Sequence, residues 1–253
     1  MGTELIDPQT IRNVTVVGEP DDTARVVHRL LRGFTRTGTG TTAAIQWVTD
    51  RREHTIRIAE LSSRAPIASL ERGIRVADGV IAVMNAASTT STRLEAILRI
   101  ADDHQVARLC LVTGLDHPGA DFNRCVRTIA DIHGAAPLPL HIPDGIGTEF
   151  DGVIDLMCMT ELIGFHGSHS QVEQWRRDLV GSVLPAADPG DADLRKFPSE
   201  QLHDRVRHLT HIGDAAPVLC DTTARHVGPL LDAIVRYLPS PMHVCQPEHA
   251  LDY

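Results

Sequence analysis

A short apolar run at residues 14–17 ends at Gly18 and is followed by a helical pattern over 24–31. A buried strand, a tight turn and a helix in this order are the layout of a phosphate-binding loop. The segment between them, Glu19-Pro20-Asp21-Asp22, is predicted to be a turn. It is acidic, and its proline lacks a backbone N–H group. The stretch therefore favours a nucleotide-binding type of α/β domain, while its charges oppose a phosphate group.

Strand and helix patterns alternate along most of the chain. Two strands at 43–49 and 54–58 are predicted to form a hairpin. Further strands are predicted at 80–84, 109–112, 137–142 and 217–220, and helices at 67–76, from Thr92, at 120–133 and at 228–238. Such alternation predicts a mostly parallel sheet with helices on both faces, which is a three-layer α/β domain.

The pattern changes between residues 148 and 214. An extended hairpin is predicted at 150–159, helices at 171–180 and 199–211, and a breaker-rich linker at 185–193. The strand and helix rhythm then resumes with 217–220 and 228–238. We therefore predict one domain over residues 1–253 with a small subdomain, 148–214, inserted before its last strand and helix.

Composition narrows the possible functions. The net charge of −9 argues against a surface devoted to nucleic acid or to a membrane. The five cysteines form no C-x-x-C pair, which favours buried reduced thiols. The histidines at 203, 208 and 211 share a predicted helix without a carboxylate or cysteine partner, so we expect exposed side chains and no metal ligation. With no signal peptide and no apolar run of ~20 residues, a cytoplasmic location is expected.

Several stretches carry a further signal through their order and spacing. They are Arg12-Asn13-Val14 and residues 71–83, 119–126, 150–156, 217–220, 229–233 and 237–241. Together they resemble the GTP-binding domain of bacterial elongation factor G over about residues 11–244, including its subdomain inserted before the final strand. The resemblance implies a P-loop GTPase-like fold with a mixed, mostly parallel sheet. It also implies GTP or GDP with magnesium as ligands and the ribosome as a partner. The family's later domains have no counterpart in this sequence.

The resemblance places the family's first nucleotide motif, A-H-x-D-x-G-K-T-T, on residues 18–25. Asp21 matches the family aspartate, whereas the family glycine and lysine have no match. The only lysine, Lys196, lies in the predicted insertion. Arg25 is a candidate substitute, although a planar guanidinium does not replace a compact ammonium inside a closed loop. The candidate residues of this degenerate motif are Gly18, Asp21, Asp22, Thr23 and Arg25.

The second and third motifs match poorly. In the second, Thr39 or Thr41 of the Gly/Thr-rich loop is the candidate for the magnesium-binding threonine, but a plain surface loop is the favoured interpretation. The third, D-T-P-G-H in the family, falls on residues 59–63, where Ala59 replaces the magnesium-linked aspartate and Ser63 the water-positioning histidine. Hydrolysis needs metal, sensing backbone and oriented water together, so this replacement predicts loss of activity.

The fourth and fifth motifs would contact the guanine base. N-K-x-D becomes Thr113-Gly114-Leu115-Asp116, which keeps only the aspartate, and Asp116 is equally well explained as a turn residue. G-S-A becomes Asp221-Thr222-Thr223. The candidate residues for residual base contact are therefore Thr113, Asp116 and Thr222.

The leading hypothesis is that the chain is a pseudo-GTPase, which acts by binding a protein partner. Under this hypothesis we expect no cofactor. One alternative is a divergent GTPase that uses Arg25, Glu60 and Asp116 in altered roles. Another is a ribosome-associated accessory factor. We also expect Asp21 or Asp22 to cap the helix after Gly18, in place of a phosphate group.

Overall fold

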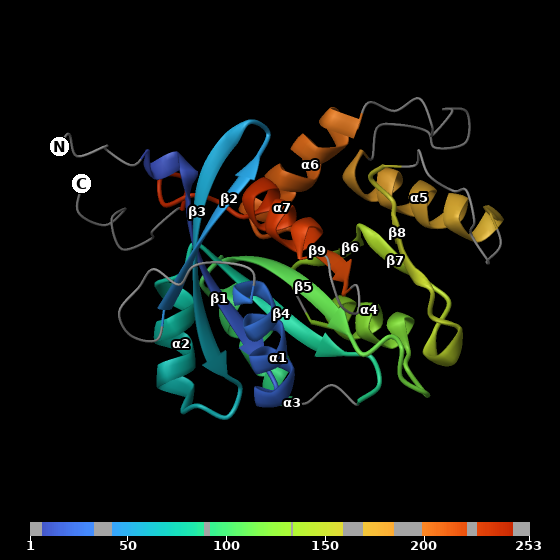
Figure 1. Cartoon of the computed structure of the whole chain (residues 1–253), viewed down its shortest axis with the longest axis horizontal. Coiled ribbons are helices and arrows are strands. Elements are labelled where there is room, and N and C mark those ends of the chain that lie inside the picture. Colours follow the sequence, from blue (N-terminus) through green and yellow to red (C-terminus); the bar gives the residue numbers. More distant parts are fainter. Residues whose placement is uncertain are drawn as a thin grey trace.

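The computed structural model describes residues 7–32, 42–88, 92–132, 134–158, 169–184, 199–221 and 227–244. Within these residues, seven strands form one sheet in the order β2-β3-β1-β4-β5-β9-β6 (Figure 1). The strands are β1 (Ile11–Gly18), β2 (Thr42–Thr49), β3 (Arg52–Ser62), β4 (Gly79–Asn85), β5 (Ala107–Thr113), β6 (Ala136–Pro139) and β9 (Ala215–Cys220). Every pairing is parallel except that of β2 with β3. The predicted three-layer, mostly parallel α/β fold is confirmed.

Helices cover the sheet and pack against it through their buried faces. They are α1 (Pro20–Leu31), α2 (Ile67–Arg75), α3 (Thr92–Asp103), α4 (Phe122–Ala130) and α7 (Gly228–Tyr237), with a short 3-10 helix, η1 (Pro8–Thr10), before β1. Helix α4 is shorter than the predicted 120–133 because Asp121 caps it, its side chain accepting a hydrogen bond from the N–H of Arg124 at 2.8 Å. Phe122, Cys125 and Ile129 form its buried face.

The predicted strand over 137–142 is wrong, because the chain divides there between two sheets. Its first part is β6, whereas β7 (His141–Asp144) pairs antiparallel with β8 (Gly152–Asp155). The N–H of Leu140 donates to the carbonyl of Val218 at 2.9 Å, after which the chain leaves the main sheet. The hairpin predicted within 150–159 is also wrong, because that range holds only β8, whose partner strand β7 precedes it across another 3-10 helix, η2 (Gly147–Glu149).

Two helices, α5 (His169–Val183) and α6 (Ser199–His211), lie between β8 and β9. In Figure 1, α6 lies beside α7, which agrees with their direct packing. Leu202 and Val206 of α6 belong to the same hydrophobic core as the sheet strands. Residues 159–168 and the predicted linker at 185–193 lie outside the described residues. The boundaries of an inserted subdomain at 148–214 stay a prediction.

Three of the four cysteines in the described residues follow their expected burial, and Cys245 lies outside these residues. Cys110, Cys125 and Cys220 are free and buried, whereas Cys158 is exposed, so the expectation is wrong for Cys158. Burial raises the pKa of the Cys110 thiol to about 12, which keeps it protonated. Among the helices of the described residues, none has the length and hydropathy that a membrane span requires.

The expected exposure of the helix α6 histidines is wrong for two of the three. His208 is exposed, but His203 and His211 are partly buried. The Nδ1 atom of His203 lies 2.6 Å from the Tyr237 hydroxyl. Burial, followed by the charges of Arg207 and Arg12, lowers the pKa of His211 to about 4. His211 is therefore neutral in the folded protein at neutral pH.

Acidification from pH 7 to about pH 5 is expected to cost about 1 kcal/mol of folding free energy through His211. The ring binds a proton in the unfolded chain below its ordinary pKa of 6.5 but stays neutral in the folded protein down to about pH 4, so stability is lost as the pH falls through this window. Chemical denaturation of the wild type and of His211→Gln at both pH values measures the term. His208→Gln is the matched control.

Burial raises the carboxyl pKa values of Asp78 and Asp221, so these two groups change the stability in the opposite direction to His211 as the pH falls. Their contribution is the same in the wild type and in His211→Gln, and it cancels when the two proteins are compared. Equal pH dependence in the wild type and in His211→Gln would contradict the assignment.

Candidate functional site

The junction between β1 and α1 holds the first candidate motif. Strand β1 ends at Gly18 and α1 begins at Pro20, so Glu19 alone connects them. The predicted turn over 19–22 is wrong, because Pro20, Asp21 and Asp22 form the first turn of the helix. Proline is favoured at this position since its φ angle suits a helix and its missing N–H would have no partner there. The two acidic side chains are favoured by the positive end of the helix dipole.

The predicted capping role of Asp21 or Asp22 is also wrong. Glu19 is the N-cap residue, and its side chain makes no capping hydrogen bond. Its carbonyl instead accepts from the N–H groups of Asp22 and Thr23 at 3.1 and 2.9 Å. The fully buried Thr23 hydroxyl is 3.0 Å from the Glu19 carbonyl and 3.1 Å from that of Pro20. The Thr23 hydroxyl is therefore already engaged within its own helix.

Asp22 is the fixed negative charge of this junction. Only 8% of the residue is exposed. Its Oδ1 and Oδ2 atoms accept from Asn85 Nδ2 at 3.1 and 3.3 Å, at the end of β4. A guanidinium nitrogen of Arg25 lies 3.0 Å from Oδ1. Asp21, by contrast, is exposed. Asp22, Thr23, Arg25 and Gly18 are thus brought together, with Asp22 joining α1 to β4.

Gly18 is required by close packing. A Cβ atom at this position would lie 2.8 Å from the carbonyl oxygen of Val83 and 3.3 Å from the Thr23 methyl group. The first of these atoms belongs to the backbone of β4, which cannot rotate away. The glycine thus permits the close approach of β1, α1 and β4.

The segment that corresponds to the third motif is tied to this junction. The N–H of Ser63 donates to the Gly18 carbonyl at 3.1 Å, and its hydroxyl lies 3.3 Å from a Glu19 carboxylate oxygen. From α3, Arg93 donates to the carbonyls of Ser63 and Ala65. Side chains of this protein therefore hold the residues that follow β3.

Two of the candidate base-contacting residues, Thr113 and Asp116, lie at the end of β5 and in the turn that follows it. Thr113 is buried, with its hydroxyl 3.4 Å from the Met84 carbonyl. Gly114 has a φ angle of +69°, and a Cβ there would lie 2.4 Å from Asn85 Oδ1. Asp116 is exposed in the following turn. The Thr113 side chain, and any side chain added at position 114, therefore has no free space around it, whereas the Asp116 side chain is open to solvent.

Asp221 lies near Asp116, and its surroundings shift the pKa of its carboxyl group. Burial raises the pKa of the Asp221 carboxyl, an ion pair with Arg29 of α1 lowers it, and the charge of Asp116 raises it further. Thr222 lies outside the described residues, as do Thr39 and Thr41. No group of His, Cys, Asp and Glu side chains in the described ranges is arranged to hold a metal ion.

The sequence analysis missed three residues that organise this region: Asn85, Arg29 and Arg93. Asn85 had a usable signal, because it directly follows the predicted strand at 80–84 and the carboxyl ends of parallel strands share one edge of a sheet. Arg29 pairs with a residue 192 positions away. Arg93 bonds backbone groups about thirty residues upstream. Local sequence patterns do not reveal such pairs.

Comparison with known proteins identifies the family to which the chain belongs. No protein-family model matches it. It is 34% identical over 233 residues to elongation factor G of Fervidobacterium nodosum, a match that covers 83% of this chain and 32% of that protein. The chain thus spans about a third of the length of this curated relative.

A crystal structure of a Thermus thermophilus protein matches with a TM-score of 0.65 and 18% identity, covering 92% of this chain and 41% of that one. At this identity the match shows the fold alone. The sequence relationship and the seven-stranded sheet agree with each other, and the chain is therefore an elongation factor G-like protein with the P-loop GTPase-like fold of a G domain.

Proposed function

We propose that this chain is a pseudo-GTPase, an elongation factor G-like G domain that does not bind GTP tightly and acts through a protein partner. The observation that carries the proposal is the single connecting residue, Glu19, between β1 and α1. A phosphate cradle needs several loop N–H groups that point inward and a lysine that reaches the β and γ phosphates. One residue followed by a proline does not supply that loop.

Electrostatics support the same proposal. The Asp22 carboxylate is fixed at the end of β4, where it would lie close to a bound phosphate group. Two like charges ~6 Å apart cost roughly 3 kcal/mol at an effective dielectric constant of ~20. Arg25 is the nearest cation of the motif, and it is paired with Asp22. The residues that are present thus fit neither the triphosphate nor its magnesium ion.

The proposal is tested by titrating the protein with fluorescent GTP and GDP analogues in the presence and absence of magnesium. We expect no saturable binding tighter than about 1 mM. A GTP-binding elongation factor titrated under the same conditions is the positive control. A sub-micromolar, magnesium-dependent affinity would contradict the proposal and favour a divergent GTPase. Phosphate release that is lost in Asp116→Ala would then assign Asp116 to that activity.

The partner is proposed to be a protein, with the ribosome as one candidate. Co-sedimentation with purified ribosomes tests that candidate separately from nucleotide binding. Ribosome binding that does not depend on added GTP is the outcome expected of a pseudo-GTPase accessory factor.

A further inference from the structure

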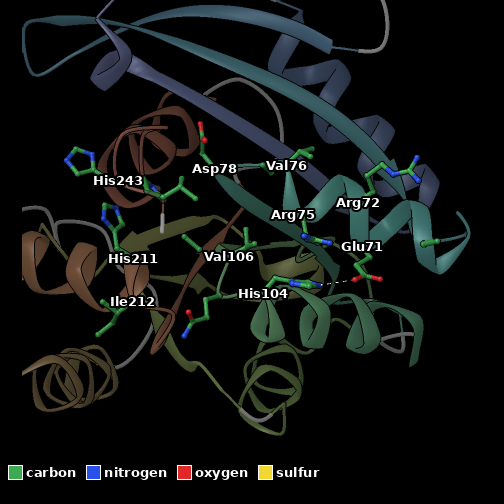
Figure 2. A pocket seen from close by; sticks show the side chains of 16 residues that line it. Glu71, Arg72, Arg75, Val76, Asp78, His104, Val106, His211, Ile212 and His243 are labelled. Atoms are coloured by element: carbon green, nitrogen blue, oxygen red, sulfur yellow. Dashed lines mark hydrogen bonds and ion pairs between the residues drawn. The ribbon is translucent and has the colours of Figure 1, made fainter. Parts of the chain in front are cut away.

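A cavity of about 800 Å³ lies beside α2, and its lining carries charges of both signs. Figure 2 shows Glu71 and Asp78 among its side chains, together with Arg72 and Arg75. This mixture selects no class of ligand by charge. The edge of the main sheet, by contrast, has a composition that fits one kind of partner.

Strand β2 forms one edge of the main sheet, and within the described residues it pairs only with β3 (Figure 1). An edge strand has a row of backbone N–H and C=O groups on its outer side, with which another strand can pair. Natural proteins commonly block such pairing with charged side chains, prolines, β-bulges or a short strand. The residues of β2 therefore decide whether this edge is open to a partner.

None of these four blocking features is present in β2. The strand is eight residues long, and its sequence, T-A-A-I-Q-W-V-T, contains no charged residue and no proline. Its register with β3 runs one to one from Thr42 to Thr49, which leaves no bulge. The opposite edge is protected, because β6 has only four residues and includes Pro137 and Pro139. The sheet thus has one edge that is suited to pairing.

The edge strand is also held in position. It joins β3 through Asp50 and Arg51, whose φ angles of +48° and +62° suit a tight two-residue hairpin turn. Asp232 of α7 accepts a hydrogen bond from Trp47 Nε1 at 2.8 Å. A guanidinium nitrogen of Arg236, also from α7, lies 3.3 Å from an Asp50 carboxylate oxygen. Such a preformed strand loses little conformational freedom when another strand pairs with it.

The side chains of β2 are complementary to those of a second copy of the same strand. A two-fold axis perpendicular to the sheet would place the two copies antiparallel, with the same face of each on the same side. With the axis beside Ile45, Ala43 lies opposite Trp47 of the other copy, and Ala44 lies opposite Gln46. Each of these pairs matches a small side chain with a large one, and no like charges oppose each other.

We propose that two copies of this chain pair antiparallel through β2 and form one continuous sheet. Because the prolines of β6 block the other edge, the assembly closes as a dimer and does not extend further. No residue of β2 is among the candidate nucleotide-binding residues, so the proposal does not depend on the proposed function.

Sedimentation velocity of the full chain from about 1 to 500 µM tests the proposal, and we expect a reversible dimer with a Kd of about 1–100 µM. The exposed Gln46 side chains of the two copies would be diagonal neighbours, about 7–8 Å apart. Gln46→Lys and Gln46→Glu are therefore each expected to weaken the dimer about tenfold through like-charge repulsion. An equal mixture of the two variants should associate at least as tightly as the wild type.

Thr55→Lys is the matched control, because Thr55 is the residue of β3 opposite Gln46 and lies one strand further from the proposed interface. It adds the same charge to the same face and should change the affinity less than about twofold. Thermal melts establish that each variant keeps its fold. A wild type that stays monomeric at about 500 µM, equal weakening by Thr55→Lys, or a mixture that associates no better than either Gln46 variant would each overturn the proposal.

Discussion

Replacing Gly18 with alanine is expected to lower the free energy of unfolding by about 3 kcal/mol. The added Cβ would lie 2.8 Å from the Val83 carbonyl oxygen and close to the Thr23 methyl group. Because Val83 contributes backbone from the centre of β4, the strain is relieved only by separating β1 from β4 or by displacing α1. Urea denaturation of the two proteins, analysed at a common m-value, measures the difference.

Gly152→Ala is the matched control, since a Cβ at Gly152 meets no atom within 4 Å. Its stability should remain within about 0.5 kcal/mol of the wild type. An unchanged stability in Gly18→Ala would show that the strand and helix have room to spare at this junction. The glycine would then need another explanation, of which close approach to a ligand is the first.

The apolar runs predicted the main sheet well because its central strands are buried on both faces. All seven residues of β5 are buried, and in β4 only Asn85 is not. Parallel strands that are covered on both faces have continuous apolar sequences. Such strands can be recognised without knowing which other strands they pair with. The split of 137–142 into two strands was not predictable in this way. It depends on a hydrogen bond from Leu140 to Val218, a residue of a distant strand.

The first motif was misread for a different reason. Glu19-Pro20-Asp21-Asp22 contains residues that are frequent in turns, but proline followed by acidic residues is equally typical of the first turn of a helix. Tertiary contacts decide between the two, since Asn85 holds Asp22 and Ser63 holds the Gly18 carbonyl. The sequence contains the residues of these contacts without indicating that they meet.

At the junction, backbone and side-chain groups of the protein bond to one another. A single connecting residue brings α1 against the end of β1, and the first-turn N–H groups of Asp22 and Thr23 already have a partner. Arg93 holds the chain after β3. These contacts give Gly18, Asp22 and Thr23 structural roles, which supports the proposed pseudo-GTPase.

Replacing Asp22 with alanine is expected to lower the free energy of unfolding by about 2 kcal/mol. The change leaves the partly buried Asn85 amide without its acceptor and removes a negative charge from the first turn of α1. Loss of the pair with Arg25 contributes little, because 63% of that arginine side chain is exposed. Thermal melts and urea denaturation measure the loss.

Asp21→Ala is the matched control, since it removes the same charge from the same turn at an exposed position. Its cost should be about 0.5 kcal/mol, the contribution of the helix dipole alone. Inorganic phosphate should not restore the stability of Asp22→Ala, because the short connection offers no cradle of N–H groups. Restoration by phosphate would show that Asp22 occupies a working anion site and would contradict the proposed pseudo-GTPase. Equal losses in the two variants would instead assign the effect to charge alone and remove the role given to Asn85.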